Sequence, residues 1–328
     1  MNRNEIQLME KGELHVHLNG LVSTDVIRNL LLRDRSDLPS GFDLERDLNI
    51  SQPADSLASY LKPWQVLRLI PKSKSCLGLI VESAFLNLKY QNITFVEIRK
   101  SVIYIALLNK ISVDEALYWV VSEIEEASER HKISAGLILT VSRGDYAQDH
   151  LRSLLEAYEK LGRPITVVGL DLAGNEDITS PTDTGSLFLH AKDKYGLKVT
   201  IHAGETGKIE NIVSAVHEFG ADRIGHGTAA SKSVEVMGLL KEKDICIEVC
   251  PISNRLTNAV KKYESHPVID FIDNNVPFVI CSDNPSIHLS CLAEDYLEFY
   301  RETNSTQHLC DMYSIQKKYS FIKGLYGN

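Results

Sequence analysis

The chain lacks the charge pattern of a protein that binds nucleic acid along a broad surface. It has 328 residues and a formal net charge of −9, with 35 basic residues against 44 acidic ones. Binding of a duplex or a long RNA needs a basic surface, so we expect no nucleic-acid partner. A small anionic ligand stays compatible with the sequence, because the charge inside one pocket can differ from the net value.

The chain also has few cysteines, and they form neither a C-x-x-C pair nor a compact disulfide framework. There are six: Cys76, Cys246, Cys250, Cys281, Cys291 and Cys310. Several lie in apolar runs, which predicts buried free thiols in a reducing compartment. No apolar run approaches the roughly 18 residues of a membrane helix. The first 13 residues lack the apolar core of a signal peptide, so we expect a cytoplasmic protein without membrane contact. The sequence does not indicate an oligomeric state.

What the chain does have is an alternation of short apolar runs with longer helical patterns. The expected strands are 14–17, 93–99, 133–141, 166–172, 198–202, 223–225, 245–250 and 278–282. The clearest helical patterns are 113–132, 149–161, 185–195, 209–219, 233–241 and 267–274. Strands that are apolar on both faces indicate a parallel sheet. Eight such repeats predict one (β/α)8 TIM barrel domain over residues 1–328. An open doubly wound sheet is the alternative, but no G-x-G-x-x-G follows the first strand.

Residues of about 28–74 interrupt this alternation. The segment contains Pro39, Gly41, Pro53, Pro63 and Pro71, with a helical pattern around 56–69. We expect a helical insertion after the first strand that covers the carboxyl-terminal mouth of the barrel. A lid over a binding site and a mere packing addition are both compatible with this pattern.

Two histidines near the N-terminus are the first candidates for a functional site. His15 and His17 lie two residues apart in the apolar run 13–18. Residues i and i+2 of a strand point to the same face, so both rings could bind a single metal ion. A coincidental surface pair is the alternative for an isolated H-x-H. The choice depends on whether the chain supplies further ligands.

Further polar residues follow other expected strands at their carboxyl ends. They are His202 and Glu205, His226, and Asp283 with Asn284. In a (β/α)8 barrel these strand ends meet in one pocket. Nitrogen and oxygen ligands favour Zn²⁺ or another divalent first-row metal, which would make a bound water more acidic. A remaining glutamate and histidine could transfer protons. Taken singly, His226 could be a turn residue and Asp283 a helix cap, but their joint occurrence by chance is improbable.

These blocks together resemble the adenosine deaminase family of the amidohydrolase superfamily. The matching segments are 13–19, 169–176, 202–205, 223–227, 250–254 and 282–285, in the family's order and over nearly the whole chain. The resemblance implies a zinc (β/α)8 barrel that replaces the 6-amino group of a purine by oxygen and releases ammonia. The P-C-x-x-C zinc site of cytidine deaminases is absent from the sequence.

The resemblance also implies a role for each matching residue. One Zn²⁺ per subunit would be bound by His15, His17, His202 and Asp283. Glu205 would protonate purine N1 while hydroxide attacks C6, and His226 with Asp283 would orient the hydroxide. The backbone N–H of Gly174 would bind N3.

Three positions depart from the family pattern, and each has asparagine where aspartate is usual: Asn19, Asn175 and Asn284. The family aspartate at position 19 holds the ribose 5′-hydroxyl and would repel a 5′-phosphate, whereas asparagine removes the charge and adds a donor. The branch that deaminates N6-modified adenosine monophosphate likewise has L-N-G. We therefore predict a 5′-monophosphate substrate such as AMP or dAMP. Phosphate contacts could come from Lys62, Arg68, Lys72 and Lys74.

The other two substitutions need not abolish activity. Asn284 replaces a carboxylate that faces purine N7, and its NH₂ group could donate to N7 directly. Asn175 is expected to change only a local loop hydrogen bond. Three alternatives stay open: an ordinary adenosine or deoxyadenosine deaminase, a deaminase of N6-substituted AMP, and an inactive homologue that only binds nucleosides.

Overall fold

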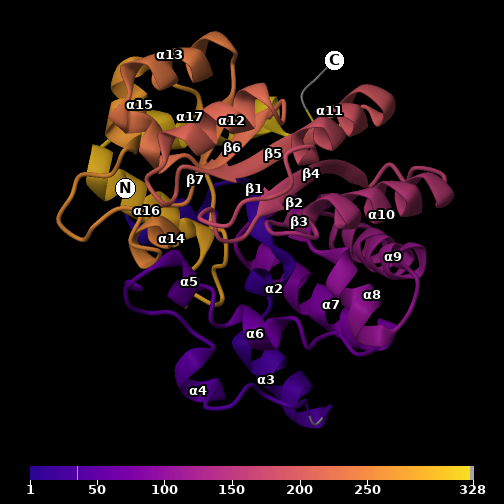
Figure 1. Ribbon diagram of the computed structural model, residues 1–328. Coiled ribbons are helices and arrows are strands. Elements are labelled where there is room, and N and C mark those ends of the chain that lie inside the picture. Colours follow the sequence, from indigo (N-terminus) through magenta and orange to yellow (C-terminus); the bar gives the residue numbers. More distant parts are fainter. Residues whose placement is uncertain (35, 326–328) are drawn as a thin grey trace.

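The barrel predicted from the sequence is confirmed. A computed structural model describes residues 1–34 and 36–325. Its single sheet has eight parallel strands that follow one another in chain order. The strands are β1 (Lys11–His17), β2 (Ile93–Lys100), β3 (Ser134–Ser142), β4 (Val167–Ala173), β5 (Lys198–Ala203), β6 (Arg223–His226), β7 (Cys246–Val249) and β8 (Phe278–Ile280). Figure 1 shows them at the centre of the molecule with helices around them.

The barrel closes between β1 and the residues that follow β8. The His17 backbone N–H donates to the Asp283 carbonyl at 3.0 Å, and the Asp283 N–H donates to the His15 carbonyl at 2.9 Å. Val16 and Asp283 thereby form a parallel bridge. Two expected metal ligands and the aspartate opposite them are thus held together by the backbone that closes the barrel.

The helices that follow β2 to β8 cover the outside of the barrel. They are α8 (Val102–Asn109), α9 (Val113–His131), α10 (Ala147–Lys160), α11 (Thr184–Tyr195), α12 (Ile209–His217), the 3₁₀ helix η1 (Thr228–Lys232), α13 (Val234–Glu242), α14 (Pro251–Leu256), α15 (Val268–Asn274), α16 (Leu292–Thr303) and α17 (Thr306–Tyr319). The six helical patterns identified in the sequence all form, with ends displaced by at most two residues. No described helix is long and apolar enough to cross a membrane.

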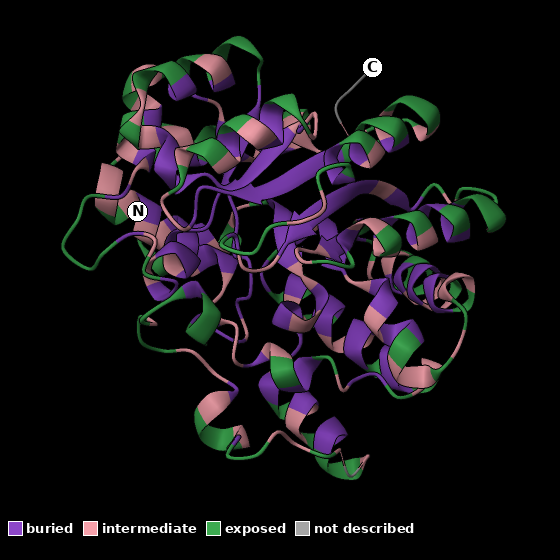
Figure 2. Cartoon of the chain, in the orientation of Figure 1, coloured by how far each residue is buried: buried purple, intermediate pink, exposed green. Residues whose placement is uncertain are grey.

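Helix α9 illustrates why these segments fold as they do. The Ser112 side chain accepts from the Glu115 backbone N–H, which caps the helix, and Lys132 ends it in the left-handed conformation. Leu117, Val120 and Ile124 recur at helical spacing and are fully buried. Figure 2 shows the result for the whole chain, with buried strands inside and exposed helix faces outside.

The insertion after β1 is a series of short helices. α1 (Arg3–Leu8) precedes β1, and α2 (Leu18–Leu21), α3 (Thr24–Arg33), α4 (Leu44–Asp47), α5 (Leu57–Tyr60) and α6 (Trp64–Leu67) follow it before α7 (Lys74–Tyr90) leads to β2. Side chains of α5 and α6 line the same cavity as the strand-end residues of the barrel. That the segment 28–74 opens and closes as a lid stays a prediction.

Candidate active site

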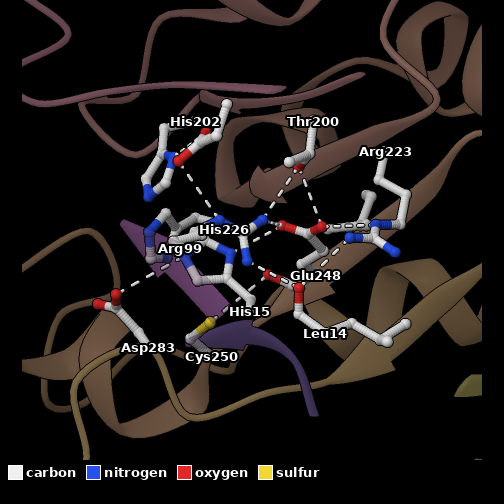
Figure 3. A network of polar contacts seen from close by, with 12 residues as sticks. Leu14, His15, Arg99, Thr200, His202, Arg223, His226, Glu248, Cys250 and Asp283 are labelled. Carbon is white, nitrogen blue, oxygen red and sulfur yellow. Dashed lines mark hydrogen bonds and ion pairs between the residues drawn. The ribbon is translucent and has the colours of Figure 1, made fainter. Parts of the chain in front are cut away.

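Four buried side chains meet at the carboxyl ends of the strands. His15, His202, His226 and Asp283 each offer one ligand atom, and these atoms all lie within 4.8 Å of one another. Figure 3 shows that they come from separate segments of the chain, three from strands and Asp283 from the segment after β8, and converge on one place. His17, the fifth member of the predicted set, is close by, with its Nε2 3.5 Å from Asp283 Oδ1. The structure therefore brings together all the residues predicted to bind metal, and it adds His226 to them.

A buried carboxylate sets the orientation of His15. The Nδ1 of His15 lies 2.7 Å from Glu248 Oε2, and Glu248 also accepts from Arg99 at 2.6 Å and Arg223 at 2.7 Å. Because a carboxylate only accepts, Nδ1 carries the proton and Nε2 keeps its lone pair. That Nε2 is buried and has no hydrogen-bond partner among the described residues. An unpartnered basic nitrogen in the cluster fits a metal ligand.

A second carboxylate holds His202 in the same way. Asp171 Oδ1 lies 2.8 Å from His202 Nδ1, which leaves the lone pair on Nε2. Burial alone would raise the pKa of Asp171, but His202 and Arg99 outweigh it and lower that pKa to about 2. Asp171 is therefore ionised and suited to orient the ring. Imidazole nitrogens and one carboxylate are a donor set typical of Zn²⁺.

Asp283 presents its two oxygens to different partners. Oδ1 lies 3.6 Å from His15 Nε2 and 3.5 Å from His17 Nε2. Oδ2 accepts from Ser253 Oγ at 2.7 Å and from the Tyr60 hydroxyl at 3.2 Å. The backbone φ of Asp283 is +61°, a strained conformation for a residue with a side chain and one that recurs at functional sites. Oδ1 is thus the oxygen that faces the histidines.

Glu205 lies at the same end of the cavity, on the turn after β5. Its backbone N–H donates to Glu176 Oε1 at 2.7 Å, and the N–H of Gly204 donates to Glu176 Oε2 at 2.8 Å. Gly204 has φ +85°, which favours glycine at the centre of this turn. Burial raises the pKa of Glu205 well above its usual range, and Glu176 and Asp283 raise it further. A carboxyl group that keeps its proton near neutral pH can act as a general acid.

The cluster opens into a cavity of about 310 Å³. Besides residues of α5 and α6, its wall includes His17, Asn19, Lys100, Gly174, His202, Glu205, His226, Asp283 and Asn284. All the predicted catalytic and substrate-binding residues thus line one cavity, whereas the buried His15 is not among its lining residues. Gly174 has φ +99°, so glycine suits the turn that brings this backbone to the cavity.

Also on the cavity wall, Asn19 is engaged on both sides of its amide. Its Nδ2 donates to the Leu67 carbonyl at 3.1 Å, and its Oδ1 accepts from Lys100 Nζ at 2.9 Å. Lys100 is only 8% exposed, and burial lowers its pKa to about 8. Among the described residues no carboxylate lies within 4 Å of this amine. A buried cation without a counter-ion is costly, which makes it a candidate partner for an anionic ligand.

The cations of the insertion are mostly engaged elsewhere. Lys62 lies 2.9 Å from Asp47, Lys72 donates to the Asp34 carbonyl at 3.1 Å, and Lys74 lies 3.9 Å from Glu123. Of the four basic residues proposed from the sequence, Arg68 alone is among those that line the cavity.

The amide of Asn284 is also occupied. Its Nδ2 donates to Asp283 Oδ1 at 2.7 Å and to the Tyr60 hydroxyl at 3.3 Å. Its Oδ1 is buried without a partner among the described residues. Donation to purine N7 would require these N–H groups to be released, so that contact stays a prediction. Asn175, as expected, makes a local loop hydrogen bond, from the Asp177 backbone N–H to its Oδ1 at 3.0 Å.

Several residues of the site escaped the sequence analysis, among them Glu248, Lys100 and Tyr60. Lys100 is the last residue of β2, one position beyond the predicted strand, and a charged residue at a strand end could have indicated it. Tyr60 reaches Asp283 from 223 positions away in the sequence. It had no signal of its own, because an aromatic residue in a helical pattern is typical of packing.

Comparisons with known proteins show the family of this chain and its fold. The model of the family described as adenosine deaminase matches residues 10–319. An adenosine deaminase from Clostridium kluyveri is 31% identical over 300 residues, which cover 90% of this chain and 85% of that protein.

Two solved structures share the fold. An adenine deaminase from Arthrobacter aurescens superimposes with a TM-score of 0.84 at 20% identity, covering 96% of each chain. An N6-mAMP deaminase from Arabidopsis superimposes with a TM-score of 0.82 at 22% identity, covering 98% of this chain and 96% of that one. The fold, the converging strand ends and the match over nearly the whole length lead to one conclusion: this chain belongs to the adenosine deaminase family and is a hydrolytic deaminase.

Proposed function

We propose that this enzyme removes the 6-amino group of a purine 5′-monophosphate, with AMP or dAMP as substrate and one Zn²⁺ per subunit as cofactor. The observation that carries the proposal is the buried amine of Lys100, which donates to Asn19 on the wall of the cavity. An aspartate at position 19 would form an ion pair with this amine. Asparagine leaves its positive charge available to a phosphate.

His15, His17, His202 and Asp283 would hold the metal. The unpartnered Nε2 of His15 and the nitrogen and oxygen donors around it support this assignment. Zn²⁺ bound there would supply a Lewis acid that makes water a nucleophile near neutral pH.

The remaining groups would act on the purine. Protonated Glu205 would donate its proton to N1 while the water oxygen attacks C6 on the same ring. Asp283 and His226 would orient that water, and the N–H of Gly174 would bind N3. Cleavage of the bond from C6 to the amino nitrogen, with a proton returned to that nitrogen, then releases ammonia and leaves the 6-oxo purine.

Charge complementarity at Lys100 favours the monophosphate over the nucleoside. A phosphate carries about −1.5 to −2 charges at pH 7 and three strong acceptor oxygens. Lys100 is a donor that such a group would satisfy, and Arg68 is a second cation on the cavity wall. The structural neighbour from Arabidopsis is named for a monophosphate substrate, which is consistent with the same preference here.

The test measures kcat/KM of the zinc-loaded enzyme for AMP, dAMP, adenosine and deoxyadenosine, from the change in purine absorbance. Both monophosphates should be preferred. Lys100→Met should lower kcat/KM for AMP about 10- to 100-fold, the value of a hydrogen bond between charged groups, and lower that for adenosine far less. Lys62→Met is the matched control, because Lys62 pairs with Asp47 on the surface. A preference of the wild type for both nucleosides would refute the proposal.

A second candidate is an N6-substituted AMP. Leu57, Leu61 and Trp64 give the cavity an apolar wall that could accept an alkyl group. Adding N6-methyl-AMP to the panel and identifying the released amine by mass separates methylamine from ammonia. Faster release of methylamine from N6-methyl-AMP than of ammonia from AMP would favour this second candidate.

A further inference from the structure

His226 differs from the other histidines of the cluster in the partner of its Nδ1. His15 and His202 both face a carboxylate there. His226 instead faces the amide of Asn254, with 3.1 Å between Nδ1 and Asn254 Nδ2. Asn254 is fully buried and continues the contact on its other side, where its Oδ1 lies 3.3 Å from Nε2 of His266.

At His266, the last residue of this series of contacts, a backbone N–H fixes which ring nitrogen carries the proton. The backbone N–H of Val268 donates to His266 Nδ1 at 3.2 Å. Val268 is the first residue of α15, and N–H groups in the first turn of a helix have no acceptor within the helix. A backbone N–H can only donate, so His266 Nδ1 must carry a lone pair. Its proton then resides on Nε2.

The protonation of His266 in turn determines donor and acceptor at Asn254 and then at His226. The protonated Nε2 of His266 needs an acceptor, so the oxygen of the Asn254 amide must face it. The NH₂ of Asn254 therefore faces His226, and it donates to Nδ1. A neutral His226 with an acceptor at Nδ1 carries its proton on Nε2. The donor at Val268 therefore fixes which way the Asn254 amide points.

We propose that Asn254 and His266 are positioning residues that hold His226 in the tautomer with the proton on Nε2. His226 then presents a hydrogen-bond donor to the cluster, whereas His15 and His202 present lone pairs. Its Nε2 lies 3.8 Å from Glu205 Oε1, beside the reacting groups of the proposed deamination. This explains how His226 can lie among metal-binding side chains and still serve to orient a water oxygen by donating to it.

Burial stabilises these hydrogen bonds. His226, Asn254 and His266 are each at most 2% exposed, so water does not compete for these hydrogen bonds. Burial also lowers the pKa of His266 to about 3, with Arg255 adding to the effect, so His266 stays neutral in the working range of the enzyme. Glu302 holds this segment in place by accepting from the His266 backbone N–H at 3.3 Å.

The inference concerns the tautomer of His226 and does not depend on the substrate's 5′ end. Its direct test is ¹⁵N NMR of the full-length, zinc-loaded enzyme labelled at histidine, with His226 assigned by comparison with His226→Gln. The expected spectrum shows a proton bonded to Nε2 of His226 and none on Nδ1. A proton on Nδ1 in the wild type would overturn the proposal, and this result requires no variant to fold.

Asn254→Asp provides the second test. A carboxylate accepts from Nδ1, so this variant should move the proton of His226 to Nδ1 or create the imidazolium. We expect kcat to fall about 100- to 1,000-fold with KM changed less than about threefold, because Asn254 does not line the cavity.

Asn258→Asp is the matched control, since Asn258 is exposed and lies four residues further on. It should leave both the His226 spectrum and kcat unchanged. Should Asn254→Asp not fold, His266→Leu is the substitute, because it removes the donor to Asn254 Oδ1 and should give a mixture of tautomers. An unchanged His226 spectrum in a folded variant would contradict the proposal.

Discussion

Two regions of the cavity wall differ in how their charges are paired: the region of the histidine cluster, called the cluster end, and the region of Lys100 and Asn19, called the Lys100 end. At the cluster end, His15 and His202 are each oriented by a buried carboxylate, Glu248 at His15 and Asp171 at His202. At the other end, Lys100 has the Asn19 amide as its side-chain partner and no carboxylate within 4 Å in the described chain. The cluster histidines thus have buried carboxylate partners, whereas the buried amine of Lys100 has none among the described residues.

This difference separates reaction chemistry from substrate choice. A reacting centre needs fixed protonation states and orientations, which buried partners provide at strand ends. Discrimination between a nucleoside and its monophosphate needs only one charge where the phosphate would lie. Changes at the cluster end should therefore reduce the rate for every substrate. Changes at the Lys100 end should alter the ratio between substrates.

The largest effect is expected from Glu205→Gln at the cluster end. The amide cannot release a proton to N1, so kcat should fall at least about 1,000-fold for AMP and adenosine alike. Bound zinc, measured by atomic absorption, should stay at the wild-type amount, since Glu205 is not among the proposed ligands. Glu210→Gln, an exposed neighbour on α12, is the control. A variant that retained a tenth of the wild-type kcat would exclude Glu205 as the acid.

The two ends also differ in how much of them could be predicted from the sequence. The barrel and the convergence of His15, His202 and Asp283 follow from local periodicity and from the rule that parallel strands end at one face. The partners behind them do not. Glu248 lies 233 positions from His15, and such a contact follows from packing rather than from any local pattern.

Of the Lys100 end, Asn19 could be identified from the sequence, but the partners of its amide could not. Asn19 was identified as the residue that departs from the family, but its amide was expected to be free for phosphate, whereas Leu67 and Lys100 occupy it. Which side chain meets an amide depends on tertiary contacts between β2 and the insertion. The substitution was visible in the sequence, and its electrostatic consequence was not.

An intermediate effect is expected from pH at the Lys100 end. Burial lowers the pKa of Lys100 to about 8, so its amine is a cation below that pH and neutral above it. The ratio of kcat/KM for AMP to that for adenosine should fall about tenfold between pH 7 and pH 9. Using the ratio cancels groups that act on both substrates, such as Glu205. Lys100→Arg keeps its charge throughout this range and should flatten the profile. A ratio independent of pH in the wild type would mean that this charge does not select the phosphate.

The smallest effect is expected from Tyr60→Phe, which sharpens the comparison because Tyr60 belongs to the insertion but acts at the cluster end. Its hydroxyl donates to Asp283 Oδ2 and also contacts Asn284 Nδ2 and His288 Nε2; of these, the hydrogen bond to the proposed ligand Asp283 is worth about 1 kcal/mol. Ser253 Oγ still donates to the same oxygen at 2.7 Å, so Asp283 stays held. We expect kcat to fall about fivefold for both AMP and adenosine, with their ratio unchanged. A change in the ratio of the values for AMP and adenosine would show that Tyr60 also affects substrate choice. The separation between residues that set the rate and residues that select the substrate would then not hold for Tyr60.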